Sequence, residues 1–425
     1  MNFTELDFRA LIYIFIALLC SACIAFTMTP LARVLAYKIG AVDVPKDKRR
    51  MHSVAMPLLG GVAIFAAFII TSLAFSDLAD NAKPLCGLLL GSTFIVITGI
   101  LDDRFNLNPF VKLGMQIVAA AIAVFFGITV DHVAVFGENS MFLLNGFSIP
   151  VTIFWIVAMT NAVNLIDGLD GLSCGVSAIS AFSILISSLF MTETPFIAIL
   201  LTAILAGSCI GFLPYNFNPA KIFMGDTGAM FLGYTLSVIS ILGVFKTTAV
   251  ISYWVPFIAF ALPLFDTTFA FVRRILHGKS PFSADRGHLH HRLIDMGFNQ
   301  RQSVTILYAI STIFGIAAVL WAIKKPIGGI LIIVSALIIL YINWKFITKS
   351  DVTRQETGLG LSHIASAAAG KDEAARTRAD VAEAQLREIG TETEENVAPD
   401  TKTTASGDAE DAADEKAPSD EEPKA

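Results

Sequence analysis

The sequence predicts an all-α membrane protein that crosses the bilayer about eleven times, and three observations support this class. The 425-residue chain is 55% hydrophobic, with 33 Phe and a mean hydropathy of +0.67. Its apolar stretches are about 17 to 25 residues long, which is enough to cross the hydrocarbon core as helices. The alternating pattern of a closed barrel, the other fold that satisfies the backbone in lipid, is absent.

Eleven apolar stretches qualify as membrane spans. They lie near residues 11–28, 57–76, 84–101, 110–127, 147–163, 175–191, 195–213, 228–245, 251–272, 303–323 and 327–347. The first stretch lacks the small-residue cleavage pattern of a signal peptide, so we expect it to be retained as a span. The five cysteines lie in or beside these runs, and we expect small buried residues with no disulfide or metal role.

Charge predicts the orientation and two domains. With these spans, thirteen Lys and Arg residues lie in loops on one side of the membrane and five on the other. Because basic loops stay in the cytoplasm, the N-terminus is expected outside and the C-terminus inside. Residues 351–425 hold 19 Asp and Glu against 8 Lys and Arg, and this segment has almost no large apolar residues. We therefore expect a membrane domain at 1–349 and an acidic, disordered cytoplasmic tail at 350–425.

Four polar signatures interrupt the apolar chain, and an odd number of spans precedes each one. The counts of three, five, seven and nine place all four on the same side, whichever way the protein points. The signatures are DDR from Asp102, NAVNLIDGLDG from Asn161, FMGDTG from Phe223 and DRGHLHHR from Asp285. Carboxylates, amides, imidazoles and guanidiniums on one face indicate a site for a charged, water-soluble substrate.

The first two signatures suit a metal or a general base. Asp102 and Asp103 stand at the C-terminal end of a span, where a carboxylate is unfavourable, so a function must explain them. In the second signature the polar side chains recur every three residues, at Asn161, Asn164, Asp167 and Asp170. Their oxygens suit Mg²⁺ or the donors of a base and ribose, and the glycines end the helix.

Two interpretations are open for the third signature, for the fourth signature and for Lys112. In GDTG, Asp226 or Thr227 reads most simply as a helix N-cap, although a phosphate cradle is compatible with it. The histidine run lacks helical zinc-ligand spacing, and its neighbouring arginines favour a phosphate and sugar clamp over zinc. Lys112 lies inside a span as a functional candidate or a snorkelling side chain. Asp266 is either the ion-pair partner of Arg273 or a supporting residue.

These residues, in this order, resemble the polyprenyl-phosphate N-acetylhexosamine-1-phosphate transferases. The resemblance runs from about Gly40 to Trp344 and includes HSVAMPLLGG at 52, DDR at 102, NAVNLIDGLDGL at 161, FMGDTGA at 223 and SPFSADRGHLHHRL at 280. The HLHH loop looks like the branch that uses UDP-N-acetylglucosamine. The acidic tail lies outside the resemblance.

The resemblance implies an enzyme of the bacterial inner membrane whose active site faces the cytoplasm. Undecaprenyl phosphate would attack the β-phosphate of UDP-N-acetylglucosamine and release UMP, with Mg²⁺ or Mn²⁺ required. Membrane lipids are expected around the protein, nucleic acid is not an expected partner, and a homodimer is left open. The implied metal ligands are Asp226 and Asn164, the catalytic residues Asp102, Asp103 and Asp167, and the substrate-binding residues Lys112, Asn161, Asp170, Arg286, His288, His290 and His291.

Two alternatives stay open at this stage. The first keeps the chemistry and replaces the donor with UDP-N-acetylmuramoyl-pentapeptide. The second, from another class, is a secondary transporter. A transporter should carry its ionisable groups near mid-span in broken helices, whereas the signatures here stand at helix ends on one side. A membrane scaffold whose acidic tail recruits partners leaves the signatures unexplained.

Overall fold

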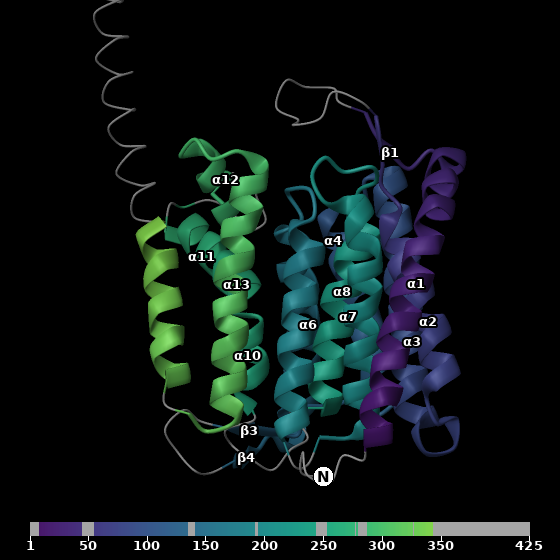
Figure 1. Cartoon of the computed structure of the whole chain (residues 1–425), viewed down its shortest axis with the longest axis vertical. Coiled ribbons are helices and arrows are strands. Elements are labelled where there is room, and N and C mark those ends of the chain that lie inside the picture. The colour runs from purple at the N-terminus through teal and green to yellow at the C-terminus, as the bar shows by residue number, and fades with distance from the viewer. Residues whose placement is uncertain are drawn as a thin grey trace, which may run out of the picture. The chain divides into compact units, whose positions relative to one another are not determined.

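The computed structural model describes residues 8–44, 55–134, 141–191, 194–243, 253–276, 278, 287–325 and 327–342, all within one compact unit at Met1–Lys349. The described chain is a helical bundle (Figure 1). The helices are α1 (Phe8–Ile39), α2 (Gly60–Phe75), α3 (Leu78–Phe105), α4 (Pro109–Phe125), η1 (Asn145–Phe147), α5 (Ser148–Leu165), α6 (Leu172–Phe190), α7 (Phe196–Asn216), α8 (Gly225–Gly243), α10 (Val255–Ala259), α11 (Ala261–Leu276), α12 (Leu289–Asp295), α13 (Gln300–Ala322) and an apolar helix at Ile327–Ile342.

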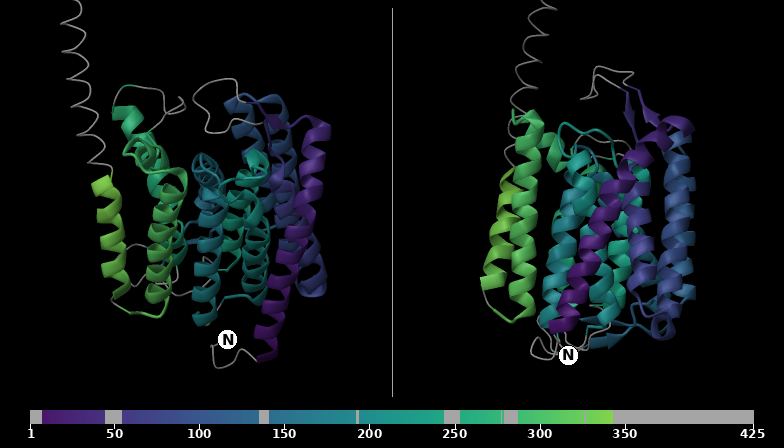
Figure 2. Two further views of the ribbon diagram at one scale, coloured as in Figure 1. Left: turned by 45° about the horizontal axis from the view of Figure 1, so that its top comes forward. Right: turned by 45° about the vertical axis from the view of Figure 1, so that its right-hand side comes forward.

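Two short antiparallel hairpins mark the two ends of the bundle. Strand β1 (Val42–Asp43) pairs with β2 (Met56–Pro57), and β3 (His132–Ala134) pairs with β4 (Met141–Leu143). Figures 1 and 2 show β1 and α12 at one end and β3 with β4 at the other. The acidic tail and Arg286 lie outside the described residues.

The expected class, an all-α polytopic membrane protein, is confirmed. Seven of the described helices are long and apolar enough to cross a membrane. Each of the eleven predicted segments overlaps a helix, but three of these helices are shorter, at 60–75, 109–125 and 327–342. The ninth segment is broken into α10 and α11 at Phe260. Many large apolar side chains on the helix surfaces are exposed, as expected where a surface faces lipid.

Helix α8 lies at the centre of the bundle, and glycines position its first turn. Every α8 residue except Asp226 is buried. A Cβ on Gly61 of α2 would lie 2.1 Å from the Gly228 nitrogen, and one on Gly99 of α3 would lie 2.3 Å from the Thr227 Cα. Because only glycine allows backbones to approach this closely, α2 and α3 hold the start of α8 between them.

The segment before α8 is joined to the segment before α2 by backbone hydrogen bonds. The Phe223 N–H donates to the carbonyl of Pro57 at 2.9 Å, and the N–H groups of Gly60 and Gly61 donate to the carbonyls of Phe223 and Met224 at 3.0 Å each. These bonds explain the PLLGG sequence, since its backbone pairs directly with the FMGD segment. They set the position from which Asp226 enters the site.

Candidate active site

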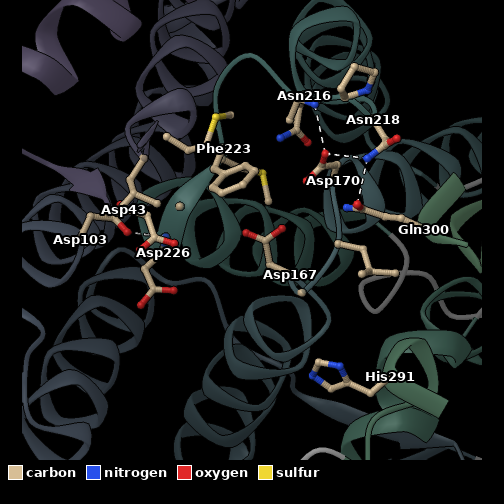
Figure 3. Close-up of a pocket in the computed structure, with 18 of the residues that line it drawn as sticks. Asp43, Asp103, Asp167, Asp170, Asn216, Asn218, Phe223, Asp226, His291 and Gln300 are labelled. Carbon is tan, nitrogen blue, oxygen red and sulfur yellow. Dashed lines mark hydrogen bonds between the residues drawn. The ribbon is translucent and has the colours of Figure 1, made fainter. Parts of the chain in front are cut away.

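A pocket of about 670 Å³ lies at the end of the bundle that carries β1. The structure brings residues from all four polar signatures to its wall (Figure 3). Those residues are Asp102, Asp103, Asp167, Gly168, Leu169, Asp170, Phe223, Met224, Gly225, Asp226 and His291. The pocket therefore joins segments that are far apart in the chain.

The turn between α3 and α4 places acidic and basic side chains opposite each other. Helix α3 ends because Asn106 adopts a left-handed conformation at φ 51°, with its N–H bonded to the carbonyl of Asp102. Helix α4 begins at once, because the Asn108 side chain caps the N–H of Phe110 and Pro109 occupies the first turn. The aspartates thus lie in the last turn of α3 and Lys112 in the first turn of α4.

Asp103 caps the N-terminus of α8. Its two carboxylate oxygens accept from the N–H groups of Asp226 and Thr227 at 2.9 and 3.0 Å and from the Thr227 hydroxyl at 2.6 Å. The positive end of the α8 dipole therefore stabilises a carboxylate that would be unfavourable at its own helix end. The prediction that Asp226 or Thr227 is the N-cap is wrong, because α8 already begins at Gly225. Two amides that would cradle a phosphate are occupied.

Lys112 lies at the centre of three oxygen ligands. Its Nζ is 2.8 Å from Asp102 Oδ2, 2.5 Å from Asp226 Oδ2 and 3.3 Å from Asn164 Oδ1. Asn164 also donates through Nδ2 to Asp226 Oδ1 at 2.7 Å. The Lys112 side chain is only 16% exposed, so these oxygens replace the water that it loses. Lys112 does not snorkel away from the site.

This oxygen set fits a hard divalent cation. Among the described residues, no group of three or more His, Cys, Asp or Glu side chains could hold a metal ion. The third oxygen here is instead the amide of Asn164. Two carboxylates and an amide suit Mg²⁺, which usually takes one or two protein carboxylates and completes its shell with water or phosphate. The ammonium of Lys112 shows that the site accepts positive charge.

Asn161 lies below this centre and is paired with a residue that the sequence analysis did not single out. Its Nδ2 donates to Gln116 Oε1 at 2.6 Å and to the Val157 carbonyl at 2.8 Å. Gln116 is 1% exposed and stands one turn after Lys112 on α4. Gln116 Nε2 donates in return to Asn161 Oδ1 at 3.3 Å, so the two amides hold α4 against α5 about one turn from Lys112 and Asn164. A buried glutamine in an apolar segment was the signal available in the sequence.

Asp167 follows the end of α5, and Figure 3 shows its carboxylate directed into the pocket. No hydrogen bond or ion pair involves this carboxylate in the described part of the chain. Burial raises the pKa of Asp167 well above its usual range. The nearby carboxylates, of which Asp226 contributes most, raise it further. A cation or a hydrogen-bond donor would be stabilised at this position.

Asp170 belongs to a hydrogen-bond network on the opposite wall. Its Oδ2 accepts from Asn218 Nδ2 at 2.9 Å and from the Ala220 N–H at 3.0 Å. Asn218 Nδ2 also donates to Gln300 Oε1 at 2.9 Å, and these side chains line the pocket (Figure 3). Neither Asn218 nor Gln300 was predicted as a site residue from the sequence. The polar NFNPAK run after α7 was the signal that could have found Asn218.

The three histidines of the last signature occupy different places on or next to α12. His291 lines the pocket. His290 is buried, and a Cβ on Gly168 would lie 2.2 Å from its Nε2, so its ring packs directly on the Asp167–Gly171 loop. Burial lowers the pKa of His290 to about 3, so it is a neutral imidazole near pH 7. His288, at the N-cap of α12, bonds to Asp266.

The fold and the pocket define the class: a polytopic membrane protein whose polar site lies at one end of its helix bundle. A model of glycosyl transferase family 4 matches residues 85–244. The probable undecaprenyl-phosphate N-acetylglucosaminyl 1-phosphate transferase of Bacillus subtilis is 41% identical over 310 residues, which cover 73% of this chain and 85% of that protein.

Two further relatives carry names of the same kind. The decaprenyl-phosphate N-acetylglucosaminephosphotransferase of Mycobacterium leprae is 32% identical, over 74% of this chain and 85% of its own. The undecaprenyl-phosphate alpha-N-acetylglucosaminyl 1-phosphate transferase of Escherichia coli is 32% identical, over 68% and 79%. The chain belongs to the polyprenyl-phosphate N-acetylhexosamine-1-phosphate transferases of glycosyl transferase family 4, and it is an enzyme. The resemblance found in the sequence is confirmed.

Proposed function

We propose that this enzyme transfers N-acetylglucosamine-1-phosphate from UDP-N-acetylglucosamine to undecaprenyl phosphate. The relatives' names give the sugar phosphate and the acceptor. The structural observation that carries the proposal is the partly buried Lys112 ammonium among the oxygens of Asp102, Asp226 and Asn164. Such a centre at the end of a membrane bundle suits the joining of two phosphates, one water-soluble and one anchored in lipid.

In the proposed reaction, an oxygen of the acceptor phosphate attacks the β-phosphorus of the donor. The bond from that phosphorus to the bridging oxygen breaks, and UMP leaves with the electron pair. The second pKa of a phosphate monoester is about 6, so near pH 7 the acceptor is mostly a dianion and a dedicated base is not essential. Catalysis then consists mainly of neutralising and aligning anions.

We assign Mg²⁺, or Mn²⁺ in its place, to Asp226 and Asn164, with Asp102 beside them. When bound, the ion would withdraw negative charge from the reacting phosphates. If a metal ion binds these oxygens, Lys112 no longer pairs with them, and its ammonium would hold a phosphate beside the ion. Asp103 uses both oxygens on the α8 N-terminus, so we propose that it positions Asp226 and is not the base. Asp102 lies 2.8 Å from Lys112 in the same centre, so we propose that it is the member of the pair that meets the acceptor phosphate or the metal.

The remaining residues are proposed to bind the donor. Asp167 faces the pocket without a partner among the described residues, so it is available to the nucleotide or to the metal. Asp170 and its Asn218 network form the opposite wall, where polar groups of the nucleotide would lie. His291 is placed to meet the pyrophosphate or sugar, with Arg286 assigned by sequence alone. Asn161 is proposed to act indirectly, by supporting Asn164.

The proposed topology has eleven spans, an outside N-terminus and an active site on the cytoplasmic face of the bacterial inner membrane. Residues 1–349 are proposed to be the catalytic domain, and 350–425 a disordered cytoplasmic tail. The excess of basic residues on the pocket side of the predicted loops supports this orientation. A cytoplasmic pocket would meet the nucleotide sugar where such donors are made.

A donor screen tests the function. The purified chain in detergent, supplied with undecaprenyl phosphate and MgCl₂, should convert UDP-N-acetylglucosamine into a lipid product and UMP. EDTA should abolish the product, and Asp226→Asn should remove it while leaving the protein folded. Turnover with UDP-N-acetylmuramoyl-pentapeptide alone would overturn the donor assignment. No transfer with any nucleotide sugar, combined with ion-coupled uptake in vesicles, would instead favour a transporter.

A further inference from the structure

One face of α11 holds the N-terminal end of the histidine helix α12. Arg273 donates to the carbonyl of Gly287 at 2.8 Å, and Arg292 Nε donates to the same carbonyl at 2.8 Å. The guanidinium of Arg292 lies 5.1 Å from the ring centroid of Phe269, in cation–π contact. Asp266 stands three residues before Phe269 and completes this face.

One carboxylate oxygen of Asp266 bonds to a histidine side chain, and the other accepts from the backbone of α12. Its Oδ2 lies 2.9 Å from His288 Nδ1, and its Oδ1 accepts from the Leu289 N–H at 2.7 Å. The side chains of His288 and Asp266 are 6% and 8% exposed, so little water competes for these bonds. The second of the two expectations for Asp266, a supporting residue, is the one that this geometry matches.

The bond to Asp266 determines which nitrogen of His288 carries hydrogen. A carboxylate can only accept, so Nδ1 must be the donor. In the neutral ring Nε2 is then left as an acceptor, free to receive a hydrogen bond. The ring of His288 also stacks on that of His290, with centroids 5.9 Å apart and an angle of 10°, and His290 packs on Gly168. The orientation of one ring therefore affects the wall of the pocket.

We propose that Asp266 is a positioning residue of the transferase. It holds His288 as the Nδ1–H tautomer and fixes the start of α12, so that the histidines meet the Asp167–Gly171 loop in the right orientation. The proposal rests on the proposed function for its kinetic test. The Nδ1–H tautomer of His288 can be tested whether or not the substrate is known.

Asp266→Asn separates the two bonds. The amide keeps an oxygen for the Leu289 N–H but presents an NH₂ group to His288, which must then accept at Nδ1 and carry its hydrogen on Nε2. We expect kcat/KM for UDP-N-acetylglucosamine to fall about 10- to 100-fold, the range seen when the carboxylate partner of a metal-bound histidine is lost. Asp266→Glu, which keeps the carboxylate, should retain more activity than the amide. Asp131→Asn, the same change at the β3 end, should leave kcat/KM unchanged.

A double-mutant cycle distinguishes positioning from a merely structural role. If Asp266 acts through His288, then Asp266→Asn combined with His288→Ala should be no slower than His288→Ala alone. If Asp266 only stabilises α12, the two losses should multiply. Multiplicative losses would overturn the proposal, and so would wild-type kinetics in Asp266→Asn. Gel filtration and melting temperature in detergent would identify any variant that fails to fold.

The tautomer itself is measurable without substrate. In the full-length chain labelled with ¹⁵N-histidine, the His288 signals are those lost in His288→Gln. We expect an Nδ1-protonated ring in the wild type and an Nε2-protonated ring in Asp266→Asn. An Nε2-protonated ring in the wild type would overturn the proposal. An inactive wild type with the expected tautomers would overturn the proposed function and leave the pairing of Asp266 with His288 intact.

Discussion

Lys112 and the proposed metal ion require the same three oxygens. The ammonium lies between the carboxylates of Asp102 and Asp226, so it offsets one of their two negative charges without a divalent ion. If the ion takes these oxygens, Lys112 must release them, and its nearest use is to hold an anionic phosphate. The lysine would then balance the carboxylates in one state and the substrate in the other.

Replacing Lys112 by Met should therefore tighten metal binding while it slows turnover. Two unit charges about 4 Å apart interact by about 4 kcal/mol at an effective dielectric near 20, so the affinity for Mn²⁺ should rise at least about tenfold. Binding is measured from the free Mn²⁺ signal in electron paramagnetic resonance. Lys38→Met, which removes an exposed positive charge at the end of α1, is the matched control and should change little. An unchanged or weaker affinity in the Lys112 variant would contradict the assignment.

Asp167 gives a dependence of stability on pH. Its pKa is raised above the usual value of 3.8, so the fold favours the neutral acid. Below pH 3.8 Asp167 is neutral in both the folded and the unfolded chain, so it does not favour unfolding. As the pH rises towards the folded-state pKa, the unfolded chain ionises more readily than the folded chain, so stability is lost. Asp167→Asn, which stays neutral, should melt at a higher temperature than the wild type in EDTA, by a margin that grows with pH. Melting curves from pH 5 to 8 test this sign, and a margin that shrinks would refute it.

Between elements, the loop from α5 to α6 and helix α12 meet at one glycine. A Cβ on Gly168 would come within 2.2 Å of His290 Nε2 and 2.8 Å of its Cε1. No atom can be that close, so Gly168→Ala must displace either the Asp167 loop or the histidine helix. The contact transmits any shift of α12 to the residues on both walls of the pocket.

We expect Gly168→Ala to reduce kcat by more than about tenfold, since displacements near 1 Å can cost a hundredfold in well-aligned reactions. The melting temperature should fall modestly, because the clash is confined to one contact between a loop and α12. Gly114→Ala on α4 is the matched control: nothing lies within 4 Å of its new Cβ, so activity should persist. Normal turnover in Gly168→Ala would show that the contact is not needed for catalysis.

The periodic and apolar features of the elements could be predicted from sequence, whereas their partners could not. Length and hydropathy located a helix at each of the eleven segments, and glycines marked the end of α5. The capping of α8 by Asp103 depends on how α3 packs against α8, which a single sequence does not encode locally. The same holds for the pairs Gln116–Asn161 and Asp266–His288. Each pair joins helices through tertiary packing.

At the scale of the whole molecule, the parity of the span count grouped the four signatures correctly. This grouping did not require the correct total number of spans. An error of two spans preserves parity, so the grouping survives a wrong total. The structure agrees with the grouping: residues from the four signatures line one pocket, although only seven described helices are long and apolar enough for a membrane span. Orientation, in contrast, depends on the basic loops and not on parity.

Labelling of single cysteines tests, in one experiment, the orientation of the bundle and the placement of its two ends on opposite sides of the membrane. In a chain whose five native cysteines are replaced, Lys221→Cys marks the pocket end and Asp131→Cys the end with β3, and both positions are exposed. A membrane-impermeant maleimide should label Lys221→Cys only in inverted inner-membrane vesicles and Asp131→Cys only in right-side-out vesicles. The reverse pattern would keep the bundle and invert its orientation, placing the pocket where no nucleotide sugar is available. Labelling of both from one side would mean that the two ends do not lie across a membrane, which no choice of orientation could repair.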